Sequence, residues 1–224
     1  MSTDGRGGAL QGNQRSLEVK LWGDYACFTR PEMKVERVTY PVMTPSAARG
    51  ALEAIFWKPQ VAWRIEEIHV LKPIAYASIL RNEINDRQSD RSARGWARYG
   101  GGYDASANRA QRHTLALRDV AYVVCAQLVL KDGVNDNIAK YRDQFRRRVA
   151  SGRCFATPYL GCREFSAAFG EPGPRDTPIH HSENLGLMLL DINYDAAGRG
   201  KQRFFHASLD QGVLRVPDRF LDVG

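Results

Sequence analysis

The sequence has few of the features that mark zinc knuckles, redox motifs and membrane proteins. Its four cysteines are irregularly spaced and include no CxxC pair, which argues against a zinc knuckle and a dithiol redox motif. No apolar run reaches the ~18 residues that suggest a membrane span, and no apolar signal region precedes the cysteines. We therefore expect a reduced, cytoplasmic protein with no membrane partner, in which the cysteines are small core residues.

Motifs of common hydrolases and nucleotide-binding enzymes are also missing. There is no nucleophile elbow, and the glycine run at 100–102 lacks the Lys and Ser or Thr of a phosphate-binding loop. The adjacent His180 and His181 have no further ligand at a metal-site spacing, so we interpret them as a solvated loop pair. We expect no metal and no other cofactor.

Acidic residues are too few to balance the basic ones. The chain has 32 Lys and Arg against 25 Asp and Glu, a formal net charge of +7 at pH 7. Such a charge attracts polyanions and favours nucleic-acid partners through counterion release. With 224 residues, 43% of them hydrophobic, the chain is long enough for one elaborated domain with a real core.

Hydrophobic patterning predicts the order strand, helix, strand, strand, helix, strand. The expected strands span 17–29, 61–80, 114–130 and 159–169, and the expected helices span 44–59 and 136–152. This order is that of a ferredoxin-like βαββαβ domain over residues 17–170, so the predicted fold class is α+β. Three short β-like runs predict a small β extension at 171–224, and residues 1–16 have the composition of a disordered tail.

The segment 81–112 interrupts this pattern. It holds seven arginines and almost no apolar periodicity, which predicts an insertion that is mobile or becomes ordered on binding. Arginines alternate with aromatic residues here, a mixture that can pair with phosphates and stack on bases. A solubilising loop, partly neutralised by its acidic residues, is an equal alternative. The predicted RNA-binding residues of this segment are Arg98, Arg109 and Arg112.

The second expected helix has an apolar face and basic flanks. Its apolar residues recur at helical spacing and form a core stripe of Ile138, Tyr141, Phe145 and Val149. Basic side chains on the flanks are placed to hold phosphates. The predicted RNA-binding residues of this region are Arg142, Arg146, Arg147 and Arg148, and Tyr25 of the first strand is a further one.

Several stretches of the sequence resemble one known family. The segments LWGDYACFTRPEMKVERVTYPVMTPSAARGALEAIFWKP, RHTLALRDVAYVV, AKYRDQFRRRV and YLGCREF are similar to the CRISPR-associated Cas5 family, in the d variant of type I-C systems. The resemblance covers roughly residues 19–169 and continues more loosely to the C-terminus. It implies the fold of the repeat-associated mysterious protein (RAMP) superfamily, a ferredoxin-like domain with a C-terminal β extension.

The same resemblance implies a function in CRISPR RNA processing. Such a protein binds the stem-loop of the precursor CRISPR RNA repeat, cuts at its base, and stays on the 5′ handle of the mature crRNA. Its further partners are the other subunits of the type I-C surveillance complex, Cascade. The implied cut is metal-independent, with in-line attack by the ribose 2′-hydroxyl. The alternative is a non-catalytic subunit that binds the handle and nucleic acid in general, including duplex DNA.

The implied catalytic positions are only partly kept. Active relatives are thought to use a Tyr where this chain has Phe56, and consecutive Lys and His where it has Lys140 and Tyr141. Of these implied catalytic groups, this chain keeps only the lysine cation, Lys140. We hypothesise that Lys140 lowers the pKa of Tyr141 so that the phenol acts as the base. His113 is the other possible base, if the insertion folds back.

Overall fold

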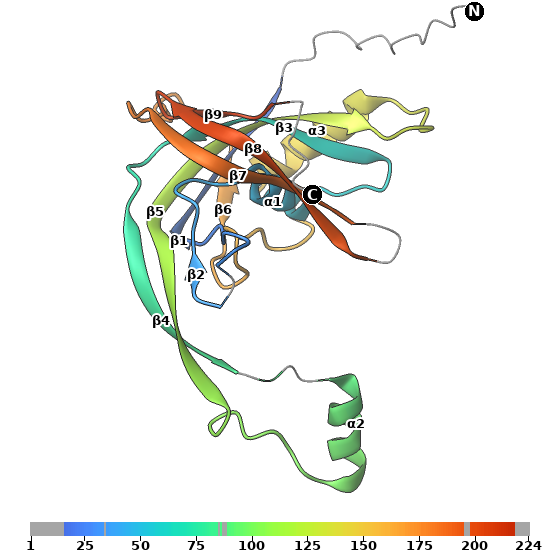
Figure 1. Cartoon of the computed structure of the whole chain (residues 1–224). Coiled ribbons are helices and arrows are strands. Elements are labelled where there is room, and N and C mark those ends of the chain that lie inside the picture. Colours follow the sequence, from blue (N-terminus) through green and yellow to red (C-terminus); the bar gives the residue numbers. More distant parts are fainter. Residues whose placement is uncertain (1–15, 34, 85, 87–88, 195–197, 218–224) are drawn as a thin grey trace, which may run out of the picture.

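One long strand, β5 (Arg109–Leu130), is the central strand of the fold (Figure 1). The computed structural model describes residues 16–217 except for 34, 85, 87–88 and 195–197. The carboxyl half of β5 pairs antiparallel with β1 (Leu17–Ala26) and β3 (Val61–Val70), while its amino half pairs with β4 (Tyr76–Ile84). The carboxyl half therefore lies in the body of the protein. The amino half leaves the body as a ribbon with β4, and it becomes two-stranded beyond Thr114, the last residue paired with a third strand.

Within the described residues, nine strands form a single curved sheet in the order β6-β1-β5-β3-β9-β8-β7, with β2 and β4 also paired to β5. Only the β2–β5 pairing is parallel among these strands. The remaining strands are β2 (Arg37–Val38), β6 (Ala168–Gly170), β7 (Glu183–Tyr194), β8 (Gly200–Asp210) and β9 (Val213–Arg215). The fold is thus α+β with a mostly antiparallel sheet.

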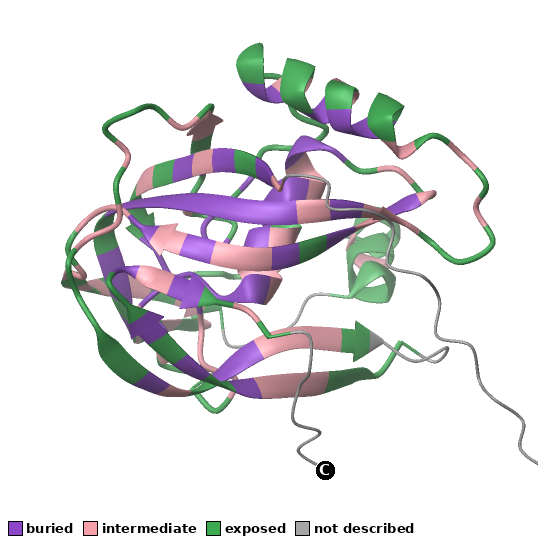
Figure 2. Ribbon diagram, turned by 90° about the horizontal axis from the view of Figure 1, so that it is seen from above, coloured by how far each residue is buried: buried purple, intermediate pink, exposed green. Residues whose placement is uncertain are grey.

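Two helices, α1 (Pro45–Ile55) and α3 (Ile138–Ala150), pack on one face of the sheet. Thr44 caps α1 by accepting a hydrogen bond from the Ala47 amide at 3.3 Å, and Pro45 occupies the first turn, as the sequence predicted. The core stripe of α3 is also confirmed, since its residues pack into the main core. Figure 2 shows buried residues concentrated in the strands beneath these helices. No helix in the described part of the chain is long and apolar enough to cross a membrane.

The segment of the predicted insertion contains regular secondary structure. β4 and the amino half of β5 form its ribbon, and α2 (Asp90–Tyr99) lies at the free end, away from the body (Figure 1). Every residue of α2 remains outside the buried core. The sequence did not indicate this arrangement, because the partly buried face of β4 carries Arg81 and Glu83 as well as Ala77 and Ile79, so its apolar alternation is weak.

Two other predicted strands differ from the structure. The single strand expected at 61–80 is divided into β3 and β4 by residues 71–75, which include Pro73, a residue that cannot donate to a ladder. The strand expected at 159–169 is mostly absent, and β6 begins only at Ala168. Residues 159–166 instead form turns, in which the Leu160 amide donates to the Phe165 carbonyl.

The three β-like runs after residue 170 correspond to β7, β8 and β9. β9 pairs with β3, so these strands continue the main sheet. The predicted tail at 1–16 lies outside the described residues except for Ser16, whose hydroxyl donates to Glu66 at 2.5 Å.

β5 has a local irregularity at Asp119. The φ of this residue is 52°, in the left-handed region, and Asp24 and Asp119 are the one pair missing from an otherwise unshifted β1–β5 register. Pairing continues on both sides, with Val120 opposite Gly23 and Arg118 opposite Tyr25. Asp119 therefore interrupts the ladder without adding a residue to the strand.

Candidate functional site

The amino end of α3 holds both residues that the resemblance implied in the AKYRDQ segment. Asn137 caps the helix by accepting a hydrogen bond from the Ala139 amide at 2.9 Å. Lys140 and Tyr141 follow in the first turn, and both contact Oδ2 of Asp136. Lys140 Nζ lies 2.5 Å from this oxygen, and the Tyr141 hydroxyl donates to it at 2.6 Å. One carboxylate therefore holds both side chains.

The hydrogen bonds of the Asp136 carboxylate shift its own pKa and those of Lys140 and Tyr141. Hydrogen bonds from Lys140, Tyr141 and the Asn137 amide lower the pKa of Asp136 to about 2. The hydrogen bond to Asp136 in turn raises the pKa of Lys140 and the pKa of Tyr141. The predicted lowering of the Tyr141 pKa is therefore wrong, because the anion that accepts the phenol hydrogen bond outweighs the neighbouring cation.

Lys140 and Tyr141 also differ in accessibility. The Lys140 side chain is 49% exposed, whereas Tyr141 is 4% exposed and packs in the core with Phe145 and Val149. A neutral, buried phenol that already donates to a carboxylate is a poor proton acceptor. Lys140 is thus the accessible ionisable group of this pair.

The position with an implied catalytic tyrosine lies in the core. Phe56 is fully buried and packs edge-on against Phe145, with ring centroids 6.5 Å apart. The guanidinium carbon of Arg148 lies 5.4 Å from the Phe56 ring centre, and its Nη1 donates to the Ile55 carbonyl at 2.9 Å. Arg148 thereby binds the carboxyl end of α1 and links the two helices. Its predicted role in binding RNA therefore competes with this structural role.

Two exposed aromatic side chains beside this helix junction were missed by sequence reasoning. Trp57 follows α1 and is 49% exposed, and Phe155 follows α3 and is 69% exposed. Their ring centroids lie 6.4 Å apart at an interplanar angle of 34°. The Phe155 amide donates to the Ala54 carbonyl at 2.9 Å, which fixes the loop after α3 against α1. No local sequence pattern links residues so far apart in the chain.

The other predicted arginines of α3 divide into buried and exposed ones. Arg142 is 6% exposed, and burial, followed by the charge of Arg146, lowers its pKa. It presents almost no surface to a phosphate, contrary to the prediction. Arg146 and Arg147 are exposed, and Arg146 forms an ion pair with Asp143 at 3.2 Å.

The predicted residues of the insertion lie on the ribbon, far along the strand from α3. Arg98 is exposed on α2 with its guanidinium carbon 5.5 Å from the Tyr99 ring centre. Arg109 and His113 are exposed and Arg112 is half-buried, all in the amino half of β5. At about 3.3 Å per residue, roughly 55 Å of strand separates His113 from Leu130, the last residue of β5 before the loop to α3. The structure therefore does not bring His113 to Lys140.

Tyr25 occupies a third place, on β1. It is 42% exposed, lies opposite Arg118 of β5, and has its ring 6.0 Å from that of Phe165. The predicted RNA-binding residues thus lie on three separate surfaces: α3, the ribbon and the end of β1.

Residues that could hold a metal lie elsewhere. Among the described residues, Glu67, His69 and Cys125 form a cluster with metal-ligand spacing on the other face of the sheet. His180 and His181 are exposed and contact Gln211 and Glu183, which agrees with the interpretation as a solvated pair.

Comparison with known proteins gives close sequence relatives. A CRISPR pre-crRNA endoribonuclease Cas5d from Mannheimia succiniciproducens is 44% identical over 214 residues, which cover 90% of this chain and 94% of the relative. A protein of the same name from Thermus thermophilus is 42% identical over 218 residues, which cover 90% of this chain and 91% of the relative.

Solved structures share the fold at lower identity. A crystal structure of a CRISPR-associated protein matches with a TM-score of 0.65 at 20% identity, covering 91% of this chain and 92% of the other. A functionally uncharacterized protein, SMU1763c from Streptococcus mutans, matches with a TM-score of 0.64 at the same identity and coverage. The sequence profile of the Cas5d family of CRISPR-associated proteins matches residues 16–217. By these matches the chain belongs to the Cas5d family.

Proposed function

We propose that this chain is an endoribonuclease that cuts precursor CRISPR RNA in its repeats and stays on the 5′ handle of the product. The observation that carries the proposal is the similarity, over 90% of the chain, to two relatives named pre-crRNA endoribonucleases. The proposed partners are the repeat stem-loop, the mature crRNA and the other subunits of the type I-C surveillance complex.

The proposed fold of residues 17–170 is ferredoxin-like. β1 and β3 are joined through α1 with β5 between them, and β5 and β6 are joined through α3 with β1 between them. Each half is thus a split βαβ unit, which supports the ferredoxin-like assignment. In this proposal β7, β8 and β9 form the C-terminal extension within 171–224.

The proposed reaction needs no metal, because the substrate supplies the nucleophile. The ribose 2′-oxygen attacks the adjacent phosphorus as its proton passes to a base, and the bond from phosphorus to the 5′-oxygen breaks. That oxygen takes up a proton, which leaves a cyclic phosphate and a free 5′-hydroxyl. Lys140 is the proposed catalytic cation, because it is protonated, exposed and available to stabilise the extra negative charge of the phosphorane.

The surface along α3, with Lys140 at its amino end and the Trp57–Phe155 pair beyond its carboxyl end, suits single-stranded RNA. The tilted pair Trp57 and Phe155 offers aromatic faces on which unpaired bases stack. Arg146 and Arg147 on α3 are exposed cations for the backbone phosphates. In this proposal the ribbon, with Arg98 and other arginines at its free end, holds a second part of the RNA.

A non-catalytic role in binding the handle, with general binding of nucleic acid including duplex DNA, is the second candidate. Phe56 in the core and Tyr141 bound to Asp136 favour it, because neither side chain can accept the proton of the 2′-hydroxyl in this arrangement. The enzyme proposal therefore requires a base other than these two residues.

The cleavage test uses the purified chain and its own repeat RNA in EDTA, beside a copy with a 2′-deoxy sugar at the cut position. We expect cutting of the first RNA and none of the second, with a cyclic phosphate at the new 3′ end. If neither RNA is cut while both bind tightly, the handle-binding role replaces the enzyme proposal. If the deoxy copy is also cut, the proposed nucleophile is wrong.

Phe155→Ala tests the stacking surface. We expect it to weaken binding of the repeat RNA by about 5- to 100-fold, since one base stacked on an aromatic ring contributes about 1–3 kcal/mol. The dissociation constant is measured by fluorescence anisotropy at one fixed salt concentration. Trp22→Ala, which removes a 37% exposed aromatic ring from β1, is the matched control. Equal losses in both variants would contradict the placement of the RNA.

A further inference from the structure

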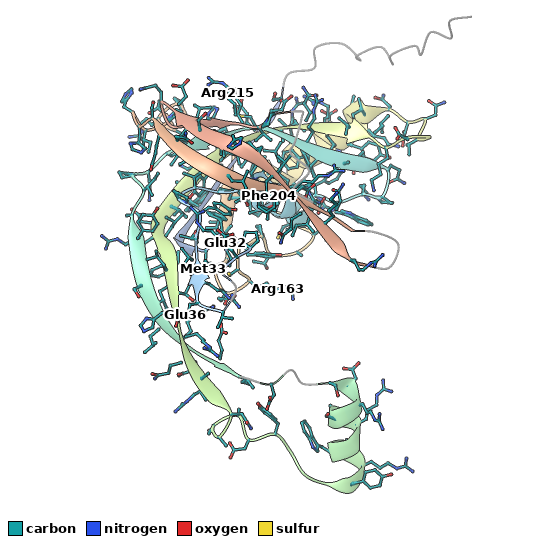
Figure 3. The ribbon with its side chains drawn as sticks, in the orientation of Figure 1. Glu32, Met33, Glu36, Arg163, Phe204 and Arg215 are labelled. Atoms are coloured by element: carbon teal, nitrogen blue, oxygen red, sulfur yellow. The ribbon has the colours of Figure 1, made fainter. Side chains whose placement is uncertain are left out.

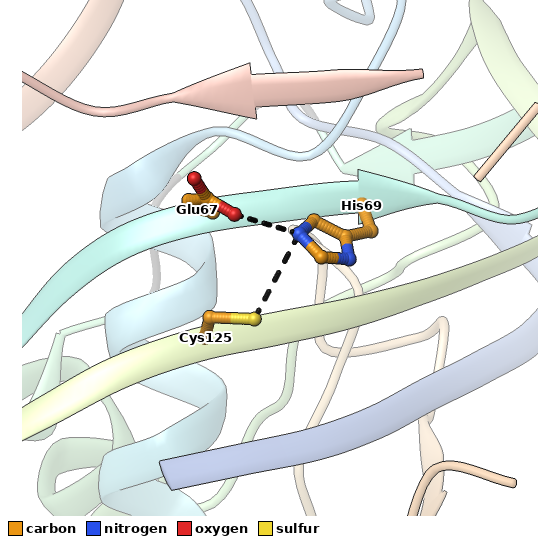
Figure 4. Close-up of side chains that lie close together, drawn as sticks. All are labelled: Glu67, His69 and Cys125. Atoms are coloured by element: carbon orange, nitrogen blue, oxygen red, sulfur yellow. Dashed lines mark hydrogen bonds and ion pairs between the residues drawn. The ribbon is translucent and has the colours of Figure 1, made fainter. Parts of the chain in front are cut away.

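A pocket on the sheet face opposite α1 and α3 collects three side chains with different metal-binding chemistry. Glu67 and His69 come from β3 and Cys125 comes from β5, and their ligand atoms all lie within 4.8 Å of one another (Figure 4). His69 Nε2 lies 2.9 Å from Glu67 Oε2 and 3.9 Å from Cys125 Sγ. None of these residues takes part in the proposed RNA site.

The pairing of the strands explains why these residues meet. The β3–β5 register shifts between Ile65 and Glu67, so a β-bulge lets Glu66 and Glu67 both face the pocket while the isoleucines on either side stay buried. Cys125 of β5 pairs with Glu67 on one side and with Glu18 of β1 on the other. Three neighbouring strands therefore contribute polar side chains to one pocket.

We propose that Cys125 Sγ, His69 Nε2 and Glu67 Oε2 bind one divalent transition-metal ion, with Zn²⁺ as the best match. A thiolate, an imidazole and a carboxylate are the ligands of zinc, whereas Mg²⁺ and Ca²⁺ take oxygen ligands. Bond lengths of about 2.0 Å to N or O and 2.3 Å to S put tetrahedral ligands about 3.3–3.5 Å apart. The separation of 2.9 Å between His69 Nε2 and Glu67 Oε2 and that of 3.9 Å between His69 Nε2 and Cys125 Sγ each differ from this range by about 0.4 Å, and the third pair lies within 4.8 Å.

The charge of the pocket also favours a cation. The carboxylates of Glu18, Glu66 and Glu67 line the pocket together with Cys125. Binding of an ion to Cys125 releases the thiol proton to solvent as the metal–sulfur bond forms. The same carboxylates attract a doubly charged ion more strongly than a proton.

Neighbouring groups orient the ligands and leave room for the ion. Arg215 of β9, labelled in Figure 3, has its Nε 3.5 Å from Glu67 Oε1, so the other oxygen of Glu67 is the one directed at His69. Arg215 is itself paired with Asp210 at 3.2 Å. The pocket has a volume of about 490 Å³, enough for an ion with water in the fourth position. Such an ion would link β3 to β5.

The test uses Co²⁺ as a spectroscopic probe in a Cys154→Ser background, which removes the one exposed cysteine in the described part of the chain. After treatment with EDTA and dialysis, Co²⁺ is titrated into the full chain. We expect saturation at one equivalent, a thiolate-to-cobalt charge-transfer band, strong visible bands of tetrahedral cobalt, and loss of all bands when Zn²⁺ is added. Adding Cys125→Ser should abolish the charge-transfer band, and adding His69→Gln should weaken binding at least about tenfold.

Thermal unfolding provides the second measurement. Zn²⁺ should raise the midpoint of the Cys154→Ser protein but not that of the protein that also carries Cys125→Ser, because an ion bound only to the native state stabilises it. Circular dichroism without metal checks that the variants fold, and Glu67→Gln replaces any variant that does not. A folded protein with no charge-transfer band, or a band that survives Cys125→Ser, would overturn the proposal. Neither result depends on RNA cleavage, so the nuclease proposal is tested separately.

Discussion

Lys140→Ala is expected to slow cleavage of the repeat RNA by about 10²- to 10³-fold, the usual loss when one preorganised group that stabilises a transition-state charge is removed. Binding of the intact RNA should change by less than about tenfold, because a single phosphate contact is a small part of the electrostatic interaction. The rate is measured under single-turnover conditions with enzyme in excess, which separates the chemical step from product release.

Two variants show whether this effect belongs to Lys140 itself. Lys72→Ala removes another exposed lysine that is paired with an aspartate, Asp119, and it should leave the rate unchanged within about twofold. Tyr141→Phe removes the hydroxyl and keeps the buried ring, and it should also keep most of the activity, since the phenol donates to Asp136 and is not the base. An undiminished rate in Lys140→Ala, or a loss of equal size in Tyr141→Phe, contradicts the assignment.

Phe145→Ala is expected to lower the free energy of unfolding by about 3–5 kcal/mol, as is typical for truncation of a buried aromatic ring. Phe145 is 1% exposed, and its ring centroid lies 4.7 Å from that of Trp63 and 6.5 Å from that of Phe56. The side chain thus joins α3 to β3 and to the end of α1. Urea unfolding followed by circular dichroism measures the loss.

The matched control is Phe155→Ala, because both substitutions remove the same side chain and differ in burial. Phe155 is 69% exposed, so its loss should change stability by no more than about 0.5 kcal/mol while it weakens RNA binding. The two variants should therefore separate the core function of this region from its binding function. A large loss of stability in Phe155→Ala would show that this ring serves packing more than RNA.

The local parts of the fold were predictable from the sequence, and the non-local parts were not. Thr44 and Pro45 start α1 because capping and the first turn depend on neighbouring residues alone. The stripe on α3 was predictable because helical periodicity reports which side is buried. The ribbon was missed because the partly buried face of β4 includes the charged residues Arg81 and Glu83, so no clear apolar pattern marks the strand.

The candidate site was predictable in part for the same reason. Lys140 was found through resemblance, and its i,i+4 pairing with Asp136 could also have been read from the sequence. The consequence for Tyr141 depends on a hydrogen bond that only coordinates reveal. The cluster of Glu67, His69 and Cys125 escaped prediction because it requires both the β3–β5 register and the bulge that shifts it.

The ribbon extends from the body as a long arm beyond Thr114, where the pairing of β5 with β2 ends. From Thr114 to Arg109 the strand reaches roughly 17 Å at about 3.3 Å per residue, and α2 lies beyond its end. By simple geometry, a rotation of about 10° at Thr114 displaces the end of this strand by about 3 Å. The position of the arginines on α2 relative to Lys140 therefore depends on the backbone angles of a few strand residues that lie in neither surface.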